Sequence, residues 1–477
     1  MIDLAVVGAG VAGSFVAHEL SQARPNWSIA LFERTDRVGG RLHSVRIAGL
    51  DDPIELGGMR YYTSHRHVHD LITALEIPTH PFGVAAGPDR SVLRGRFADG
   101  SGDPASGAAY DLSDDERGLS PGELVAEAFE RIVPGAGRLD EDGWVRTRAT
   151  HRHRGHPLVD WSIGDALSSV LSPEGHRLVI DAFGYDSGLR GFNAGDSIPY
   201  MLGSGHPGMQ ARVPDEGMDR IPRTLVAGLE RRGGVLRLRH ELREVHRDDG
   251  LFRLHFTDQE PVLARRVVLA LPAPALRLLV AGSPPLTTPV IDGMLESVDL
   301  WQAAKLYLWF DSPWWRDGFL AGRTTTDLPP RKLYYFDSRP TGPAALLAAY
   351  TDGRDVEPWA TLADGAPAGS AATVDMLVAA SDHLRALHPS TPHIPPPVGS
   401  AFIHWGADPH ETGWHYWRAG ARSDAVIAAA PQPDPGLDLY VCGEAFSRSQ
   451  AWVEGALETG ASVVSKLLSG SESEAGT

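Results

Sequence analysis

The sequence predicts an α/β fold that starts, almost at the first residue, with a strand, a glycine-rich turn and a helix. Residues 4–7 are a short apolar run typical of a buried strand, and residues 14–23 have a helical pattern. The motif Gly8-Ala9-Gly10-Val11-Ala12-Gly13 joins them. A second apolar strand, residues 28–32, ends in Glu33. These observations predict a Rossmann-type parallel sheet, because G-x-G-x-x-G between a strand and a helix is the signature of a dinucleotide-binding unit.

Each glycine of the motif has a separate physical task. Gly8 permits the tight turn, Gly10 lets the backbone approach a pyrophosphate, and Gly13 lets the helix pack closely on the strand. The helix N-terminus, next to Ala12, points free N–H groups and the positive end of its dipole at the phosphates. Glu33 can accept hydrogen bonds from both ribose hydroxyls and would repel a 2′-phosphate. We therefore expect an unphosphorylated adenosine, as in NAD or FAD.

Composition and charge disfavour several classes of protein. The 477 residues and a hydrophobic content of 42% suffice for about three domains with real cores. A net charge of −17 argues against nucleic acid and anionic membrane surfaces as partners. The single cysteine, Cys442, rules out an internal disulfide. The sequence shows no signal peptide and no apolar run of about twenty residues, so we expect a cytoplasmic protein without a membrane-spanning helix.

The histidine-rich stretches do not predict a metal site. His65, His67 and His69 alternate, which on a helix scatters them around it, and we interpret them as surface or packing residues. The histidines of residues 151–156 stand among arginines, which oppose a cation, so a solvated basic loop is the better interpretation. The sequence leaves the oligomeric state open, and a homodimer is one alternative.

The loop after the second strand indicates which dinucleotide binds. Arg34 follows Glu33, and Arg37-Val38-Gly39-Gly40-Arg41 brings two more glycines and a guanidinium suited to phosphate. The segment from Glu33 to Arg41 resembles the E-x(5)-G-G-R signature of glutathione-reductase-like flavoproteins, especially the flavin amine oxidases. The resemblance implies FAD as the cofactor, with contacts from Glu33, Arg34, Gly40 and Arg41. It also implies a glutathione-reductase-like, Rossmann-type FAD-binding domain, a mixed-sheet substrate domain and an inserted helical domain.

The resemblance covers nearly the whole chain in matching order and divides it into three domains. The expected FAD-binding domain comprises residues 1–60, 214–297 and 436–477, the substrate domain residues 61–110 and 298–435, and the helical domain residues 111–213. The sequence pattern predicts helices at residues 121–132, 162–171 and 173–183, and strands at residues 91–97 and 298–310. In the family, a histidine of the helical domain lies near the substrate. Pro199 falls close to that point and His206 beyond it, so we assign no histidine an acid/base role.

The segment Glu55-Leu56-Gly57-Gly58-Met59-Arg60 indicates the class of substrate. In the flavin amine oxidases an E-L-G-G segment runs beside the flavin, and its glycines, here Gly57 and Gly58, let the backbone pass close to the ring. Met59 and Arg60 resemble the G-x-M-R of L-amino acid oxidases and tryptophan monooxygenases, whose arginine holds the substrate carboxylate. A planar guanidinium that meets a carboxylate with two parallel hydrogen bonds suits recognition of an α-amino acid. The alternative is a surface arginine at the end of a strand.

Two further residues match family positions at the substrate. Lys305 lies in an otherwise apolar predicted strand, where a buried ammonium is costly unless it is paired or solvated. The family lysine at this point holds a water against the flavin N5, and the alternative is a lysine that snorkels at a strand edge. Residues 324–350 resemble a block of L-amino acid oxidases whose terminal tyrosine, here Tyr350, hydrogen-bonds the substrate carboxylate. The alternative for Tyr350 is a core tyrosine with a satisfied hydroxyl.

The C-terminal part of the chain resembles the remaining family contacts. Monoamine oxidases anchor FAD through a cysteine in the segment that matches residues 413–417, and this chain has none there, so we expect non-covalent FAD. The resemblance places Leu242 at the adenine, Gly443 and Glu444 at the pyrophosphate and ribityl, Val453 at the flavin pyrimidine, Trp452 as a wall facing the ring, and His415 and Tyr416 at the border of the substrate side-chain pocket.

These residues together lead us to interpret the chain as an FAD-dependent L-amino acid oxidase. The substrate would be oxidised to an imino acid, which hydrolyses to a 2-oxo acid and ammonia, while dioxygen is reduced to hydrogen peroxide. Three alternatives stay open: an amine oxidase acting on a non-amino-acid amine in secondary metabolism, a decarboxylating amino acid 2-monooxygenase, and a non-catalytic FAD-binding protein. Arg60 argues against the first, and Lys305 with Trp452 argues against the third. The sequence identifies no particular amino acid.

Overall fold

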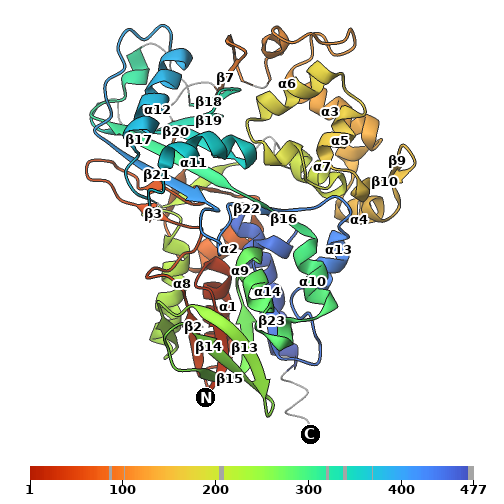
Figure 1. Cartoon of the computed structure of the whole chain (residues 1–477), viewed down its shortest axis with the longest axis vertical. Helices are drawn as coiled ribbons and strands as arrows, with labels where there is room; N and C mark the ends of the chain where they lie inside the picture. The colour runs from red at the N-terminus through yellow and green to blue at the C-terminus, as the bar shows by residue number, and fades with distance from the viewer. Residues whose placement is uncertain are drawn as a thin grey trace.

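The molecule has three parts, two sheets with their covering helices and a separate group of helices (Figure 1). The computed structural model describes residues 1–84, 89–100, 102–203, 209–317, 322–336, 341–367 and 369–470. The first sheet lies at the lower end of Figure 1, the second sheet at the upper left and the helical group at the upper right. The predicted fold class is confirmed. No helix in the described part of the chain is long and apolar enough to cross a membrane.

The first sheet is built around the strand that begins the chain. β1 (Ile2–Val7) pairs in parallel with β2 (Ile29–Phe32) on one side and with β15 (Val262–Leu269) on the other. The strand order is β12-β2-β1-β15-β14-β13, and β23 pairs in parallel with β15. The outer strands are β12 (Val235–Arg237), β13 (Leu242–Asp248), β14 (Leu251–Phe256) and β23 (Leu439–Val441).

Both faces of β1 are buried at residues 4–7, which explains why this part of the strand is continuously apolar. Leu4 and Val6 pack into the cluster that contains one set of helices, while Ala5 and Val7 pack into the cluster on the opposite face. A strand covered on both sides can expose only its ends, so a ligand must bind beyond the carboxyl ends of the parallel strands. The helices of the first cluster are α1 (Val11–Ala23), α8 (Arg220–Arg231) and α14 (Val453–Gly470).

The second sheet carries the residues expected at the substrate. Its strand order is β21-β17-β20-β19-β18-β7-β8. Lys305 on β17 and Lys332 on β19 are both in register with Tyr350 on β20, one on each side. The strands are β7 (Asp89–Leu93), β8 (Arg96–Ala98), β17 (Ala303–Phe310), β18 (Arg323–Thr326), β19 (Lys332–Phe336), β20 (Ala344–Asp352) and β21 (Gly399–Trp405).

The two faces of this sheet have different neighbours. Two helices, α11 (Glu357–Ala363) and α12 (Val374–Leu387), cover the face on which Leu306, Leu333 and Tyr335 are buried. Residues alternate between faces along a strand. Lys305, Tyr350 and Tyr334 therefore lie on the opposite face, which packs against residues 54–59 of the first part. This face closes the cavity described below.

Two helices of the helical group begin at capping residues that can be recognised in the sequence. Ser120 and Glu123 form a reciprocal capping box at the start of α3, and Ser172 caps α6. The predicted helices 121–132 and 173–183 coincide with α3 and α6, whereas the predicted helix 162–171 is only α5. The group comprises α3 (Pro121–Ile132), α4 (Glu141–Thr150), α5 (Ile163–Ser168), α6 (Pro173–Phe183) and α7 (Ala194–Gly203).

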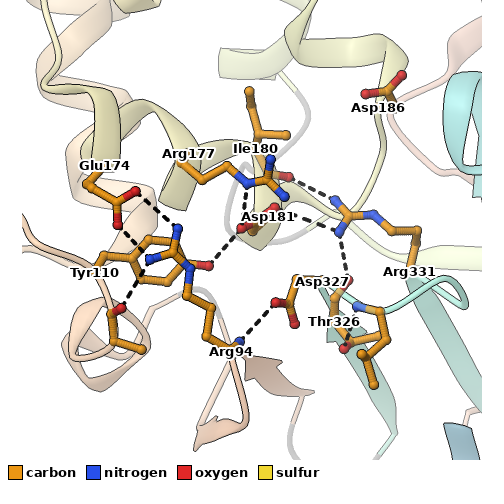
Figure 2. A network of polar contacts seen from close by, with 12 residues as sticks. Arg94, Tyr110, Glu174, Arg177, Ile180, Asp181, Asp186, Thr326, Asp327 and Arg331 are labelled. Carbon is orange, nitrogen blue, oxygen red and sulfur yellow. Dashed lines mark hydrogen bonds and ion pairs between the residues drawn. The ribbon is translucent and has the colours of Figure 1, made fainter.

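A polar network fixes α6 against the second sheet (Figure 2). The Arg331 guanidinium is buried and donates to the carbonyl oxygens of Thr326 (2.9 Å) and Ile180 (3.1 Å). Arg94 pairs with Glu174 at the other end of α6, with an N–O distance of 2.6 Å. The Ile180 carbonyl also accepts a long hydrogen bond of 3.4 Å from the Gly184 N–H, so Arg331 adds a second donor at the end of α6 while holding it to the sheet.

Two predicted strands are interrupted in the structure. Residues 91–97, predicted as one strand, form the hairpin β7–β8, because Arg94 and Gly95 adopt positive φ angles of 48° and 74° and turn the chain. Residues 298–310 divide into β16 (Val298–Trp301) and β17, and β16 pairs with β22 (Trp414–Trp417) in a separate two-stranded sheet. Pro199 lies within α7, and His206 lies outside the described residues.

The remaining elements connect these parts. β3 and β4 pair as an antiparallel hairpin, and α2 begins at Arg66. The connecting elements are β3 (Ser44–Val45), β4 (Ile54–Glu55), β5 (Tyr61–Tyr62), α2 (Arg66–Ala74), β6 (Thr79–Pro81), β9 (Arg152–His153), β10 (His156–Pro157), β11 (Ala211–Pro214), α9 (Ala273–Val280), α10 (Pro289–Glu296) and α13 (Ser423–Ala429).

Candidate active site

One cavity runs from the end of β2, past the glycine turn, to the second sheet. It is lined by residues from both sheets, and its walls include Glu33, Gly10, Lys305 and Tyr350. Most of the cofactor residues predicted from sequence line it: Gly8, Gly10, Ala12, Glu33, Arg34, Gly40, Arg41, Gly57, Gly58, Leu242, Gly443, Glu444, Trp452 and Val453. Segments from the beginning, middle and end of the chain thus meet at one site.

The three glycines of the turn differ in what surrounds them. A Cβ atom on Gly8 would lie 2.4 Å from the Ala270 carbonyl oxygen, and Gly8 has a φ of 103°. A Cβ atom on Gly13 would lie 2.0 Å from the Gly8 carbonyl oxygen. At Gly10, by contrast, a Cβ atom meets no atom within 4 Å. Gly8 and Gly13 are therefore required by the fold, whereas Gly10 keeps space open in the cavity for a ligand.

Helix N-termini supply the cavity with unpaired backbone donors. α1 starts at Val11, and its N-cap residue Gly10 provides no side-chain cap, so the first N–H groups stay available to an anion. α14 starts at Val453, which also lines the cavity. The preceding Ala451 has a φ of 66°, a strained value for a residue with a side chain. Both helices thus begin at the cavity wall, and the uncapped start of α1 suits a pyrophosphate.

The adenosine end of the cavity is formed by the carboxylate at the end of β2. Glu33 accepts hydrogen bonds from the backbone N–H of Ala9 (2.9 Å) and of Thr35 (2.9 Å), and these bonds fix its orientation. Arg34 forms ion pairs with Asp408 and Glu411, both at 3.1 Å. A carboxylate held by backbone donors fits an unphosphorylated ribose better than a phosphorylated one.

A buried polar group holds the middle of the cavity together. Glu444 is in contact with Arg41 and His415, each with an N–O distance of 2.5 Å, and accepts from the backbone N–H of Ala451 (2.9 Å). Burial raises the pKa of Glu444, but His415 and Arg41 outweigh burial and hold the pKa well below its usual range. Because the Ala273 N–H donates to Nε2 of His415 (3.3 Å), the imidazole donates from Nδ1 to Glu444.

The glycine segment expected beside the flavin, residues 55–58, accepts hydrogen bonds from Lys305. A Cβ atom on Gly57 would lie 1.9 Å from the Arg41 carbonyl oxygen, so only glycine fits there. The Lys305 ammonium donates to the carbonyl oxygens of Gly57 (2.5 Å) and Glu55 (2.9 Å). Burial lowers the pKa of Lys305 to about 7, and burial raises the pKa of the Glu55 carboxyl to about 7. Two N–H groups of the ammonium are used, and within the described residues the third has no hydrogen-bond acceptor, so it is available to a ligand or water.

Aromatic side chains close the substrate end of the cavity. Tyr350, Trp414 and Trp452 line it, and the Lys305 ammonium lies 4.8 Å from the centre of the Tyr350 ring. Tyr185 packs edge-on against Tyr350 (5.3 Å between ring centres) and against Trp414 (6.3 Å). The Trp452 indole N–H donates to the Tyr200 hydroxyl at 3.0 Å. The helical group therefore contributes Tyr185 and Tyr200 to this wall.

Arg60 stands one side chain behind this wall. Its guanidinium carbon lies 5.2 Å from the Phe82 ring centre and 5.7 Å from the ring centres of Tyr62 and Tyr334. The Nη1 atom is buried and has no hydrogen-bond acceptor among the described residues. A buried donor without an acceptor costs about 1–3 kcal/mol. Arg60 does not line the cavity, and Tyr62, which its guanidinium faces, packs on the cavity residue Trp452 with 5.3 Å between ring centres.

Several predicted site residues lie off the cavity surface. His415 is completely buried behind Glu444, and Tyr416 is stacked on Phe192 with 4.5 Å between ring centres, so neither borders the cavity within the described residues. The two residues are neighbours on β22 and therefore point to opposite faces of the β16–β22 pair, His415 toward Glu444 and Tyr416 toward Phe192. Gly13 packs against the turn, and Met59 is buried in the core of the second part.

The sequence interpretation missed several side chains near the substrate. It gave no role to Tyr185, Tyr200, Lys332 or Tyr334, and it treated His65 as a surface or packing residue. His65 packs on Trp452 with 4.8 Å between ring centres, and burial lowers its pKa to about 4. Alternation along β19 could have placed Lys332 and Tyr334 on one face. No local signal could have found Tyr185 and Tyr200, because their position depends on how the helical group docks.

The glycine turn, the carboxylate at the end of β2 and the two helix N-termini define a protein that binds a dinucleotide cofactor. The chain belongs to the family described as flavin containing amine oxidoreductase, which it matches over residues 11–468. Its cofactor is accordingly FAD, and the open space beside Gly10 fits this group. It is an FAD-dependent oxidoreductase.

Individual relatives match along nearly the whole chain at modest identity. Aplysianin-A from Aplysia kurodai is 27% identical, covering 98% of this chain and 90% of its own. The flavin-dependent L-tryptophan oxidase RebO from Lentzea aerocolonigenes is 26% identical, covering 98% of each chain. The L-amino-acid oxidase of Mus musculus is 26% identical over 95% of this chain and 69% of its own.

Solved structures support the same fold. Putrescine oxidase bound to putrescine superposes with a TM-score of 0.73 at 16% identity, covering 98% of this chain and 99% of that one. Cyclohexylamine oxidase from Brevibacterium oxydans superposes with a TM-score of 0.71 at 18% identity, with the same coverage. At these identities the likeness concerns the fold alone.

Proposed function

We propose that this protein catalyses the oxidative deamination of an L-α-amino acid. The observation that carries the proposal is the Arg60 guanidinium, which is enclosed by aromatic rings and keeps a buried donor without an acceptor. A substrate carboxylate would supply that acceptor and make a charge-assisted pair worth about 1.5–3 kcal/mol. A simple amine would leave the donor unpaired. Relatives that are named L-amino acid and L-tryptophan oxidases support this proposal.

The residues around the cavity have separate tasks in this reaction. Arg60 and Tyr350 hold the carboxylate and thereby orient the Cα–H of the substrate, and positioning of this kind can supply several kcal/mol of the barrier. Trp452, Trp414 and Tyr185 exclude water from the reacting carbon. The free N–H of Lys305 holds a water or an oxygen species in the cavity. FAD, when bound, supplies the hydride acceptor and passes the electrons to dioxygen.

The products separate this proposal from its rivals. We expect purified protein to be yellow, to be bleached anaerobically by at least one of the twenty common amino acids, and to release a 2-oxo acid, ammonia and hydrogen peroxide in air. Formation of an amide and carbon dioxide would instead identify a decarboxylating monooxygenase. Bleaching by amines and by no amino acid would identify an amine oxidase. A protein that keeps its colour with every substrate would point to the non-catalytic alternative.

We further infer that FAD is held without a covalent link. Cys442, the only cysteine of the chain, is buried and absent from the cavity lining, and His415 is turned toward Glu444. Acid precipitation should therefore release all of the flavin into the supernatant. Yellow colour that stays with the precipitated protein would contradict this inference.

A further inference from the structure

Two of the three lysines in this chain lie on one face of the second sheet. Only three of its 44 basic residues are lysines: Lys305, Lys332 and Lys466. Lys466 is exposed on α14. The other two lie on the face that closes the cavity, in register with Tyr350 from opposite sides. Lys305 lines the cofactor cavity, whereas the proposed reaction gives Lys332 no role.

The position of Lys332 is fixed by the end of α6. A Cβ atom on Gly184, the left-handed residue that ends α6, would lie 2.8 Å from Cε of Lys332, so the lysine stem packs directly under this turn. The network around Arg331 holds the same turn to the sheet (Figure 2). The ammonium lies 4.5 Å from the ring centre of Tyr185 and 5.8 Å from that of Phe183.

No carboxylate within the described residues pairs with the Lys332 ammonium. The ammonium instead faces the rings of Phe183 and Tyr185. The ionisable groups that act on the Lys332 ammonium are Tyr334, Arg323, Arg60 and Asp89, and Asp89 is already held by a 2.8 Å hydrogen bond from the Arg323 Nε. Arg60 likewise has no carboxylate partner. Within the described residues, these two half-buried cations therefore have no carboxylate partner, and the anionic form of Tyr334 is the group that would offset their charge.

Tyr334 interacts electrostatically with both of these cations. The Tyr185 hydroxyl is hydrogen-bonded to the Tyr334 hydroxyl, and the Arg60 guanidinium carbon lies 5.7 Å from the Tyr334 ring centre. Burial alone would raise the pKa of Tyr334, but Arg60, Lys332 and Arg323 outweigh burial and lower the pKa to about 7. The site therefore attracts negative charge at two points, one at Arg60 and one at Lys332.

We propose that Lys332, with the Tyr185 and Tyr334 hydroxyls, binds a second carboxylate on the substrate side chain, so that the preferred substrate is a dicarboxylic L-amino acid resembling glutamate or aspartate. This inference rests on the proposed function. The α-carboxylate would bind between Arg60 and Tyr350, and the side-chain carboxylate would bind one strand farther along the same face. Neighbouring strands are about 4.8 Å apart, a spacing that a side chain of two or three carbons can span. A cationic substrate would be repelled.

Matched substrate pairs test the inference on the holoenzyme. L-Glutamate against L-glutamine, and L-aspartate against L-asparagine, differ in charge and hardly in shape. We expect kcat/KM of the parent to favour the acid of at least one pair by tenfold or more. Lys332→Met should lower this preference at least tenfold, Lys332→Arg should keep a preference for the acid, and the exposed control Lys466→Met should keep the parent's ratio.

A binding measurement gives a second readout that needs no turnover. Glutarate, a dicarboxylate without an amine, should perturb the flavin absorbance of the holoenzyme at lower concentration than butyrate, and Lys332→Met should remove that difference. The inference is overturned if the parent oxidises neutral amino acids as well as acidic ones, or if Lys332→Met leaves both ratios unchanged. If no amino acid of any charge bleaches the flavin, the proposed function itself fails, and the glutarate titration still reports on Lys332.

Discussion

The two ends of the cavity are built in different ways. At the nucleotide end, backbone N–H groups, glycines and the start of α1 come from one short stretch, Gly8 to Gly13. At the substrate end, Arg60, Tyr185 and Tyr350 come from three separate parts of the chain and meet only through packing. The nucleotide end can therefore be predicted from local sequence, whereas the substrate end depends on tertiary packing.

The difference reflects what each ligand presents. A pyrophosphate needs close approach of the backbone, which only glycine and an uncapped helix allow. A substrate that must be distinguished from similar molecules needs side chains of specific charge and shape, held by neighbours. Mutations at the nucleotide end should accordingly act on cofactor binding or on the fold, and mutations at the substrate end on selectivity and rate.

The largest expected effect separates two glycines of the same turn. Gly8→Ala forces a Cβ atom to 2.4 Å from the Ala270 carbonyl oxygen at a φ of 103°, and overpacking of this kind costs about 1–3 kcal/mol. Gly10→Ala meets no protein atom within 4 Å. We expect Gly8→Ala to lower the thermal midpoint of the apoprotein, and Gly10→Ala to leave that midpoint unchanged while weakening FAD affinity at least tenfold.

Thermal unfolding of the apoproteins and a fluorescence titration with FAD provide the two measurements. Gly10→Ala protein that binds FAD as tightly as the parent would show that the space beside Gly10 is not used by the cofactor. A stable Gly8→Ala apoprotein would show that the turn can relax, and the distinction between the two glycines would then fail.

At the substrate end, the next effect concerns Lys305. Lys305→Met keeps the apolar stem and removes the ammonium that donates to Glu55 and Gly57. We expect flavin reoxidation by dioxygen to slow at least tenfold and flavin reduction by substrate to change much less, because the free N–H and the positive charge serve the oxygen step. Stopped-flow measurement of both half-reactions decides, and an unchanged reoxidation rate would reduce Lys305 to a structural residue.

A smaller effect should appear in the pH dependence of the same step. The pKa of Lys305 is about 7, so the ammonium is charged below that pH and loses its charge as the pH rises through it. We expect the reoxidation rate to fall severalfold between pH 6 and pH 8, toward the rate of Lys305→Met. Glu55 raises the pKa of Lys305, so Glu55→Gln should move the midpoint to lower pH. A flat profile in the parent would contradict this assignment.

The same contrast explains how far the sequence alone could predict the structure. The turn at Gly8, the carboxylate of Glu33 and the helices α3 and α6 follow from short-range chemistry, so local pattern was sufficient for them. The division of residues 298–310 into two strands depends on pairing with β22, which lies more than a hundred residues away. For the same reason His415, predicted at the substrate, lies behind Glu444, and Tyr185 could not be assigned at all.

The most direct test of the account is the response of Arg60→Ala to a substrate and its decarboxylated analogue. Removal of the guanidinium leaves the substrate carboxylate unpaired, which usually costs more than the pair contributes. We expect kcat/KM for anaerobic flavin reduction by the best L-amino acid to fall at least about tenfold, because about 1.4 kcal/mol corresponds to a factor of ten. The value for the matching amine should change much less. Tyr350→Phe should act in the same direction more weakly. If Arg60→Ala is reduced by the amino acid as fast as the parent, or if the parent prefers the amine, the carboxylate is not recognised here and the amino acid assignment is wrong.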